Sequence, residues 1–138
     1  MPKFQLVAPF LEIAAVAYST LIKDADLALA RAVLDAAAGG DDTEVKDTGL
    51  KQVGFSPTLY QDYTDNGLDE ILFAAYDAKT ELAIKFRYST AAIGAANPEY
   101  RFSAKVSGFS PISGQHGQFI MTKPNFVISS GSVTRAVA

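Results

Sequence analysis

The sequence predicts a mainly β protein with one flanking α-helix. Two stretches, residues 81–88 and 100–107, alternate apolar with polar side chains along almost their whole length. Such alternation is typical of strands that have one buried and one solvated face. A third stretch, residues 64–76, instead repeats its apolar residues at the spacing of a helix. The chain has 138 residues, enough for one core, so we expect a single domain over residues 1–138.

The composition argues against several classes of function. Cysteine is absent, which removes disulfides, thiolate nucleophiles and thiolate metal sites together. The formal net charge of −3 argues against a protein that grips nucleic-acid phosphates, because that requires a basic face. The apolar start, residues 4–16, is interrupted by Gln5, Pro9 and Glu12 and lacks the basic flank of a signal peptide. We therefore expect synthesis in the cytosol and no membrane insertion.

The N-terminal third contains one stretch that local rules do not decide. Residues 1–7 are expected to form an arm and residues 10–18 a first strand, which ends at a turn at Ser19 and Thr20. Residues 21–38 are Ala-rich and bounded by helix-terminating glycines, which favours a helix. Alternate apolar residues between 27 and 33 fit a strand equally well. The pattern leaves both possibilities open for residues 24–38.

Residues 39–49, with the sequence GGDDTEVKDTG, are expected to form a long exposed loop. They are polar, contain three glycines and show no apolar periodicity. Their acidic residues do not have the spacing of a calcium loop, and the closing glutamate is missing, so a solvated tip is the simpler interpretation. Residues 50–61 follow as a strand, in which Pro57 indicates an edge or a bulge.

The helix is expected at about residues 67–76, with Asn66 as its N-cap and Asp69 in its first turn. Its apolar stripe, which includes Leu68 and Leu72, predicts that it lies on the face of a sheet. Residues 119–128 and 132–137 are expected to complete the β structure after two loops rich in small residues.

No catalytic group is predicted. His116, the single histidine, lies between two glycines in an expected loop, with no nucleophile motif to accompany it. The carboxylates Asp62, Asp65 and Asp69 lie around the start of the helix, where they have a structural reason to be. We therefore expect no enzyme activity, no catalytic or cofactor-binding residues and no metal site.

Five short motifs occur in an order that resembles one protein family. They are GLK at residues 49–51, QDY at 61–63, NPEY at 97–100, a Pro/Gly loop at 109–117 and GSVTRA at 131–136. In this order and spacing the chain resembles the major tail tube proteins of long-tailed bacteriophages, in particular those of actinobacterial hosts. The resemblance covers nearly the whole length, and none of its motifs is a catalytic signature.

This resemblance implies a tail-tube-type β-sandwich or barrel in which residues 21–38 are strand. It implies hexameric rings that stack into a hollow tube, through which genomic DNA passes without catalysis and without a cofactor. The protein would then be located in the virion tail and assembled in the cytoplasm of the bacterial host. Its implied partners are further copies of itself, the tape measure protein and the tail terminator, with transient, non-specific passage of DNA.

Stacked rings need complementary upper and lower surfaces, and exposed charged loops and arms suit that contact. We expect contacts between subunits from the loop 39–49 and from the arms 1–7 and 132–138, and a net negative wall facing the DNA. The candidate contact residues are Asp41, Asp42, Glu44, Lys46, Asp47, Phe4 and Arg135. The alternatives are another ring-forming tail or injection-system protein, or a small β-barrel that binds an apolar ligand.

Overall fold

The computed structural model of the chain describes residues 3–6, 8–35, 39–40, 46–128 and 133–137. Within these residues the protein is mainly β, with antiparallel sheets and one α-helix, α1 (Leu68–Ala78). The other elements are β1 (Phe10–Ile13), β2 (Val16–Ala17), the 3-10 helix η1 (Ser19–Leu21), β3 (Ile22–Asp24), β4 (Leu27–Asp35), β5 (Lys46–Phe55), β6 (Thr58–Tyr60), β7 (Glu81–Arg87), β8 (Glu99–Gly108), β9 (Met121–Thr122), β10 (Asn125–Val127) and β11 (Thr134–Ala136). The mainly β prediction is confirmed.

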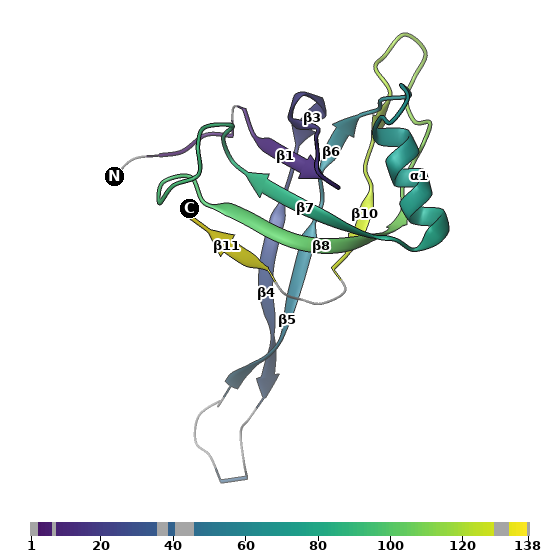
Figure 1. The fold of residues 1–138 in the computed structure, drawn as a ribbon. Coiled ribbons are helices and arrows are strands. Elements are labelled where there is room, and N and C mark those ends of the chain that lie inside the picture. The colour runs from purple at the N-terminus through teal and green to yellow at the C-terminus, as the bar shows by residue number, and fades with distance from the viewer. Residues whose placement is uncertain (1–2, 7, 36–38, 41–45, 129–132, 138) are drawn as a thin grey trace.

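The largest sheet has the strand order β10-β8-β7-β1-β2, and β11 also pairs with β8 (Figure 1). Its central strands β7 and β8 are antiparallel, and Ile84 lies opposite Phe102. Alternate residues along this pair are buried: Leu82, Ile84, Phe86, Phe102, Ala104 and Val106. This confirms that residues 81–88 and 100–107 form strands that share one core.

A smaller sheet, in the order β3-β6-β9, and the helix α1 contribute to the same core. Phe55, at the end of β5, lies near its centre. The Phe55 ring centroid is 5.5 Å from that of Phe86, 5.3 Å from that of Phe102 and 5.8 Å from that of Phe126. Packed rings at these spacings stabilise the interior and fill the space between the elements.

The expected first strand over residues 10–18 is wrong in one respect, because the structure divides it into the hairpin β1–β2. Ala14 and Ala15 form the turn, and both have positive φ, of 53° and 67°. Glycine or asparagine is the usual residue at such left-handed positions, so two alanines give no turn signal in the sequence. The turn predicted at Ser19 and Thr20 is present as η1.

Helix α1 begins one residue later and ends two residues later than the expected 67–76. The expected N-cap is wrong: Gly67 is the N-cap and makes no side-chain capping bond. The Asn66 backbone N–H instead donates to Glu70 Oε2 at 2.8 Å, so a carboxylate satisfies a donor at the helix start. The apolar stripe is confirmed, since Leu68, Leu72 and Ala75 are buried.

Residues 27–35 form the strand β4, so the open question is settled as strand over this range. β4 pairs antiparallel with β5, which already begins at Lys46. The expected loop 39–49 is therefore too long, because residues 46–49 belong to a strand. Only Gly39 and Gly40 of the expected loop tip lie within the described part of the chain.

The expected strands 50–61 and 119–128 are each divided at a proline. β5 ends before Ser56 and Pro57, and β6 then joins the smaller sheet. Lys123 and Pro124 separate β9, which pairs with β6, from β10, which pairs with β8. Proline has no N–H to donate to a neighbouring strand, so the strand pairing is interrupted at each proline. After each interruption the chain continues in a different sheet. Residues 129–132 lie outside the described part of the chain.

Candidate subunit interface

The hairpin of β4 and β5 projects from the body of the protein (Figure 1). Its root is anchored by the buried Phe55, which lies opposite Leu27, but its two strands pair only with each other in the described part of the chain. Four apolar side chains on it are exposed: Leu29 by 56%, Val33 by 68%, Leu34 by 52% and Leu50 by 84%. An isolated two-stranded hairpin is marginally stable in water, and its open edges invite pairing. The hairpin therefore combines exposed apolar side chains with open strand edges, two features that are typical of a protein interaction surface.

One face of the hairpin carries apolar and cationic side chains in turn. Leu29 lies opposite Val53, and Arg31 lies opposite Lys51 in the next position of the same face. The register then shifts, and Val33 follows the cations along β4. The other face carries Ala28, Ala30 and Leu34 on β4, with Gly54 and Gln52 opposite the two alanines on β5. The pairing of Arg31 with Lys51 places two like charges directly across the ladder, an arrangement that is unfavourable by itself.

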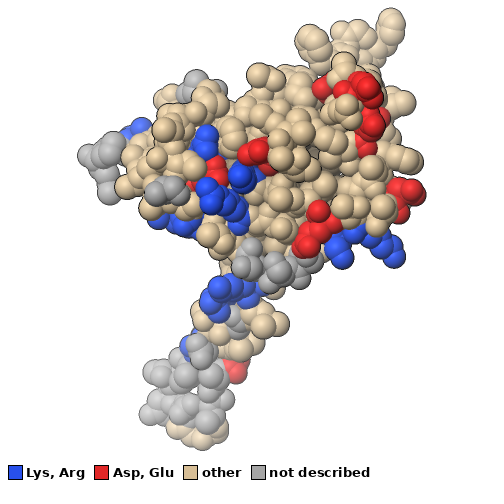
Figure 2. Space-filling model, viewed as in Figure 1, with Lys and Arg blue, Asp and Glu red and all other residues tan. Residues whose placement is uncertain are grey.

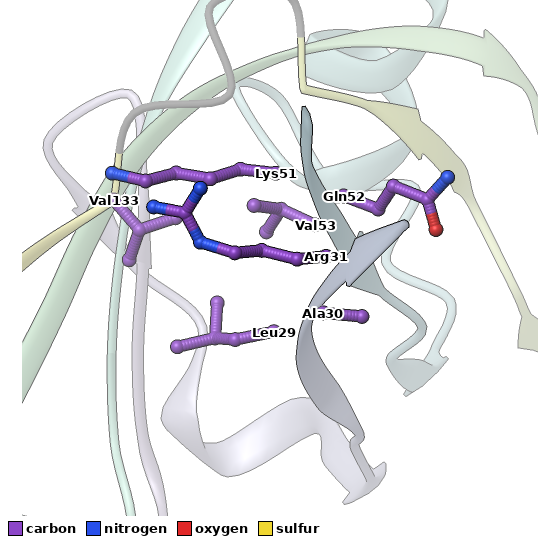
Figure 3. Close-up of a pocket in the computed structure, with 7 residues that line it drawn as sticks. All are labelled: Leu29, Ala30, Arg31, Lys51, Gln52, Val53 and Val133. Atoms are coloured by element: carbon purple, nitrogen blue, oxygen red, sulfur yellow. The ribbon is translucent and has the colours of Figure 1, made fainter. Parts of the chain in front are cut away.

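An open cavity of about 450 Å³ lies along this face. Figure 3 shows that the side chains of Arg31 and Lys51 extend in the same direction, toward Val133 of the C-terminal segment. Leu29 and Val53 complete the apolar part of the lining. The cavity combines apolar walls with two cationic groups.

The four predicted contact residues that the structure describes do not come together in one site. Lys46 is exposed, and Lys46 and Asp47 are the first residues of β5, on the projecting hairpin. Phe4 is 62% exposed, although its ring contacts that of Tyr88 edge-on at 5.3 Å between centroids. Arg135 is exposed on β11, where it lies opposite Tyr100. Asp41, Asp42 and Glu44 lie outside the described residues.

The face of the largest sheet that points away from the core carries paired charges. Glu99 is 2% exposed and accepts hydrogen bonds from Arg87 and Arg101. Burial opposes the ionisation of Glu99, but the hydrogen bonds and charges of the two guanidinium groups outweigh it, so its pKa lies below its usual value. Nearby, Lys85 lies 3.9 Å from the carboxylate of Glu12. Lys85, Arg87 and Arg101 on this face thus each have a carboxylate partner.

A second exposed apolar surface lies along α1. Tyr63, Phe73 and Tyr76 are 52%, 58% and 52% exposed. Phe73 lines two hollows, one of about 540 Å³ that also contains Asp69 and Glu70, and one of about 290 Å³ that also contains Tyr76 and Phe109. The Tyr63 hydroxyl donates to the carbonyl of Pro111, which fixes the ring at the edge of this surface.

His116 is exposed in a turn between β8 and β9. In the described part of the chain, no three His, Cys, Asp or Glu side chains lie close enough together to hold a metal ion. No helix there is long and apolar enough to cross a membrane. The hairpin and α1 each carry several exposed apolar side chains, and Ile112 and Phe119, between β8 and β9, are also exposed, by 79% and 81%.

Sequence reasoning identified residues 39–49 as a contact region but missed most of the hairpin. The apolar alternation of residues 27–33 was visible, but alternation alone does not say whether a strand lies in the body of a protein or projects from it. The exposed aromatic residues of α1 were also missed, because only the apolar residues at helical spacing on its buried face were used to predict the helix.

A scan against models of known protein families finds no match, and a comparison with curated protein sequences finds none either.

Proposed function

We propose that this protein is the structural subunit of a phage tail tube, in which hexameric rings stack into a hollow tube for genome delivery. The observation that carries the proposal is the projecting β4–β5 hairpin with Leu29, Val33, Leu34 and Leu50 exposed. In a monomer these apolar side chains stay exposed to water, which does not stabilise the protein. In a repeating assembly each subunit would bury them against its neighbour. The resemblance of the motifs described above points to the same function.

Within a ring, the edges of the largest sheet offer the lateral contact. On one side β10 and β11 both pair with β8, along different parts of its length, and on the other side the sheet ends at β2. These edge strands are short, and a neighbouring copy that docks there would continue the ladder from subunit to subunit. Repetition of this heterologous contact closes a ring when the rotation per subunit allows it.

Between rings, the hairpin supplies a contact of a different kind. A projection on one side of a subunit that docks on another side of the next subunit is head-to-tail, and such a contact does not close on itself. It therefore grows into a tube. The arms that contain Phe4 and Arg135 would add contacts at ring borders, the tape measure protein would occupy the lumen during assembly, and the tail terminator would end growth. No catalysis is part of this function.

Electron microscopy of the purified full chain tests the proposal. The expected result is rings and tubes of uniform diameter, alone or after seeding by a tail tip. Rings without tubes would favour the second candidate, another ring-forming tail or injection-system protein. A monomer at all concentrations, with and without a seed, would contradict both.

A matched pair of variants shows whether the hairpin is responsible. Leu50→Ser changes a side chain that is 84% exposed on the hairpin, and Ile112→Ser changes one that is 79% exposed in the loop after β8. We expect both variants to fold, as judged by circular dichroism, and only Leu50→Ser to impair tube formation. Equal tube formation by the two variants would show that the hairpin does not carry the assembly.

A further inference from the structure

We propose that the outer face of α1 receives the β4–β5 hairpin of a second copy of this chain. The proposal rests on the tube function proposed above and names the two surfaces that meet when copies stack. Phe73 and Tyr76 on this face and Tyr63 at its edge are each more than half exposed. Large aromatic side chains gathered on a solvated helix face are typical of an interaction site.

The shape of this face suits a β-hairpin. Phe73 stands between two hollows, of about 540 Å³ and about 290 Å³. Side chains on one face of a strand are spaced roughly 7 Å apart, at every second residue. A strand that crosses the helix can therefore place one side chain in each hollow, with the Phe73 ring between them.

The chemistry of the two surfaces is complementary. The larger hollow is lined by Asp65, Asp69 and Glu70 beside the Phe73 ring, so it favours a cationic side chain. The hairpin offers Lys51, which lies opposite Arg31 and on the same face as Leu29 and Val53. Figure 2 shows acidic atoms gathered over the upper part of α1 and basic atoms at the root of the projecting hairpin. Opposite charges on the two surfaces favour this pairing over contact between two hairpins or two helices.

The directions of the two elements permit the contact. The hairpin projects from one end of the body, and the N-terminal end of α1, with its carboxylates, points toward the other end (Figure 1). A copy displaced along the hairpin axis therefore brings its hairpin to the end of its neighbour at which α1 begins, and a sideways shift then places it along α1. The nine residues of β4 extend about 30 Å, enough to run past the 11 residues of α1, which extend about 16 Å.

Disulfide trapping tests the contact, because the chain contains no cysteine of its own. The variant carries Val33→Cys on the hairpin and Phe73→Cys on α1. Oxidation of assembled tubes should give a ladder of covalent oligomers that reductant removes. The control carries Val33→Cys with Ala83→Cys, an exposed position on β7 on the sheet face opposite the core. The control should give no ladder.

A charge exchange tests the same contact without removing Phe73. Lys51→Glu and Asp69→Lys should each raise the protein concentration needed for tube formation several-fold, with the fold retained by circular dichroism. The double variant should return it close to the unmodified value, because the ion pair is restored in reverse. A double variant as impaired as the two single changes combined would overturn the inference.

The outcomes separate this inference from the proposed function. Normal tubes in which Val33→Cys and Phe73→Cys form no ladder would overturn the hairpin–helix contact and leave the tube function standing. An unmodified chain that forms neither rings nor tubes would overturn the proposed function itself. If the two cysteine substitutions prevent tube formation, the Lys51→Glu and Asp69→Lys variants test the hairpin–helix contact in their place.

Discussion

Arg87 Nη1 donates a hydrogen bond of 2.5 Å to Glu99 Oε2, across the pair of strands at the centre of the largest sheet. Arg101 Nε donates one of the same length to the other carboxylate oxygen. The Arg87 guanidinium also lies 3.9 Å from the ring centroid of Phe10 on β1. The almost fully buried carboxylate therefore joins β7 to β8, and Arg87 extends this connection to β1.

This arrangement predicts a defined dependence of stability on pH. The pKa of Glu99 is lowered in the folded protein, from an ordinary value of 4.5. Its stabilising effect is therefore fully present above pH 4.5 and is lost as the pH falls below that value through the folded pKa. We expect Glu99→Gln to lower the free energy of unfolding by about 3–5 kcal/mol at neutral pH, because two guanidinium groups lose their anion. It should also flatten the decline of stability in acid. Denaturant unfolding at a series of pH values measures both effects.

Glu12→Gln is the matched control for Glu99→Gln. Glu12 also pairs with a cation across strands, but Lys85 Nζ is 3.9 Å away and its side chain is 43% exposed. Solvent-exposed pairs contribute less than about 1 kcal/mol, so this change should have little effect on stability. Equal losses from the two changes would contradict the role assigned to the buried carboxylate.

The core around Phe102 gives a second prediction. Phe102 is 5% exposed, and its ring packs edge-on against Phe55. Phe102→Ala should lower the free energy of unfolding by about 3–5 kcal/mol, since it removes buried apolar surface and leaves a cavity. Phe73→Ala is the control, because Phe73 is 58% exposed, and it should change the stability of the isolated subunit by less than about 0.5 kcal/mol. An unfolding midpoint left unchanged by Phe102→Ala would show that this face is not buried.

Gly67 gives a third prediction, which concerns the start of α1. A Cβ atom at this position would lie 2.8 Å from the carbonyl oxygen of Thr64 and 3.0 Å from that of Asp62. Both are backbone atoms, so Gly67→Ala must displace the turn that precedes the helix. We expect a loss of stability of about 1–3 kcal/mol by thermal unfolding.

Gly54→Ala is the matched control for Gly67→Ala. A Cβ atom at Gly54, on β5, meets nothing within 4 Å. We expect this change to be neutral, or to stabilise the subunit by about 0.5–1 kcal/mol, because alanine restricts the unfolded chain more than glycine does. A loss of stability comparable to that of Gly67→Ala would argue against the close approach at the helix start.

The parts of the fold that the sequence predicted well are those in which one periodicity dominates. β7, β8 and the buried stripe of α1 followed directly from alternating or helical apolar spacing, because each has one clearly buried face. The β1–β2 turn was missed because Ala14 and Ala15 adopt positive φ without the usual glycine or asparagine. The identity of β4 stayed open because alanine-rich segments satisfy helix propensity, whereas pairing with β5 is a tertiary effect.

The candidate interface was harder to predict for a related reason. Val33 and Leu50 follow the same apolar rules as core residues, yet they are 68% and 84% exposed. A sequence pattern records that a side chain is apolar, but the surface that covers it can belong to another molecule. The structure shows that the hairpin projects, because in the described residues β4 and β5 pair only with each other. The sequence pattern does not contain this information.

A tube that delivers DNA must not hold it, which leads to the last prediction. Free lysines and arginines on the wall would bind phosphates with an affinity that falls steeply with salt. On the face of the largest sheet that points away from the core, Lys85 pairs with Glu12, and Arg87 and Arg101 both pair with Glu99. We expect this face to line the tube. Its three paired cations outnumber the two carboxylates, so here the ion pairs, and not the net negative charge expected from the sequence, would keep the cations from binding DNA.

Co-sedimentation of duplex DNA with assembled tubes, between about 50 and 200 mM salt, measures this property. Unmodified tubes should retain little DNA at any salt concentration in this range. Glu12→Gln removes the carboxylate beside Lys85 in every subunit, so tubes of this variant should retain more DNA and release it as salt increases. Tight, salt-sensitive binding by unmodified tubes would contradict the prediction that the wall releases DNA. No change with Glu12→Gln would show that this face does not meet the DNA, because a newly unpaired lysine repeated around each ring must add to phosphate binding wherever DNA passes close to it.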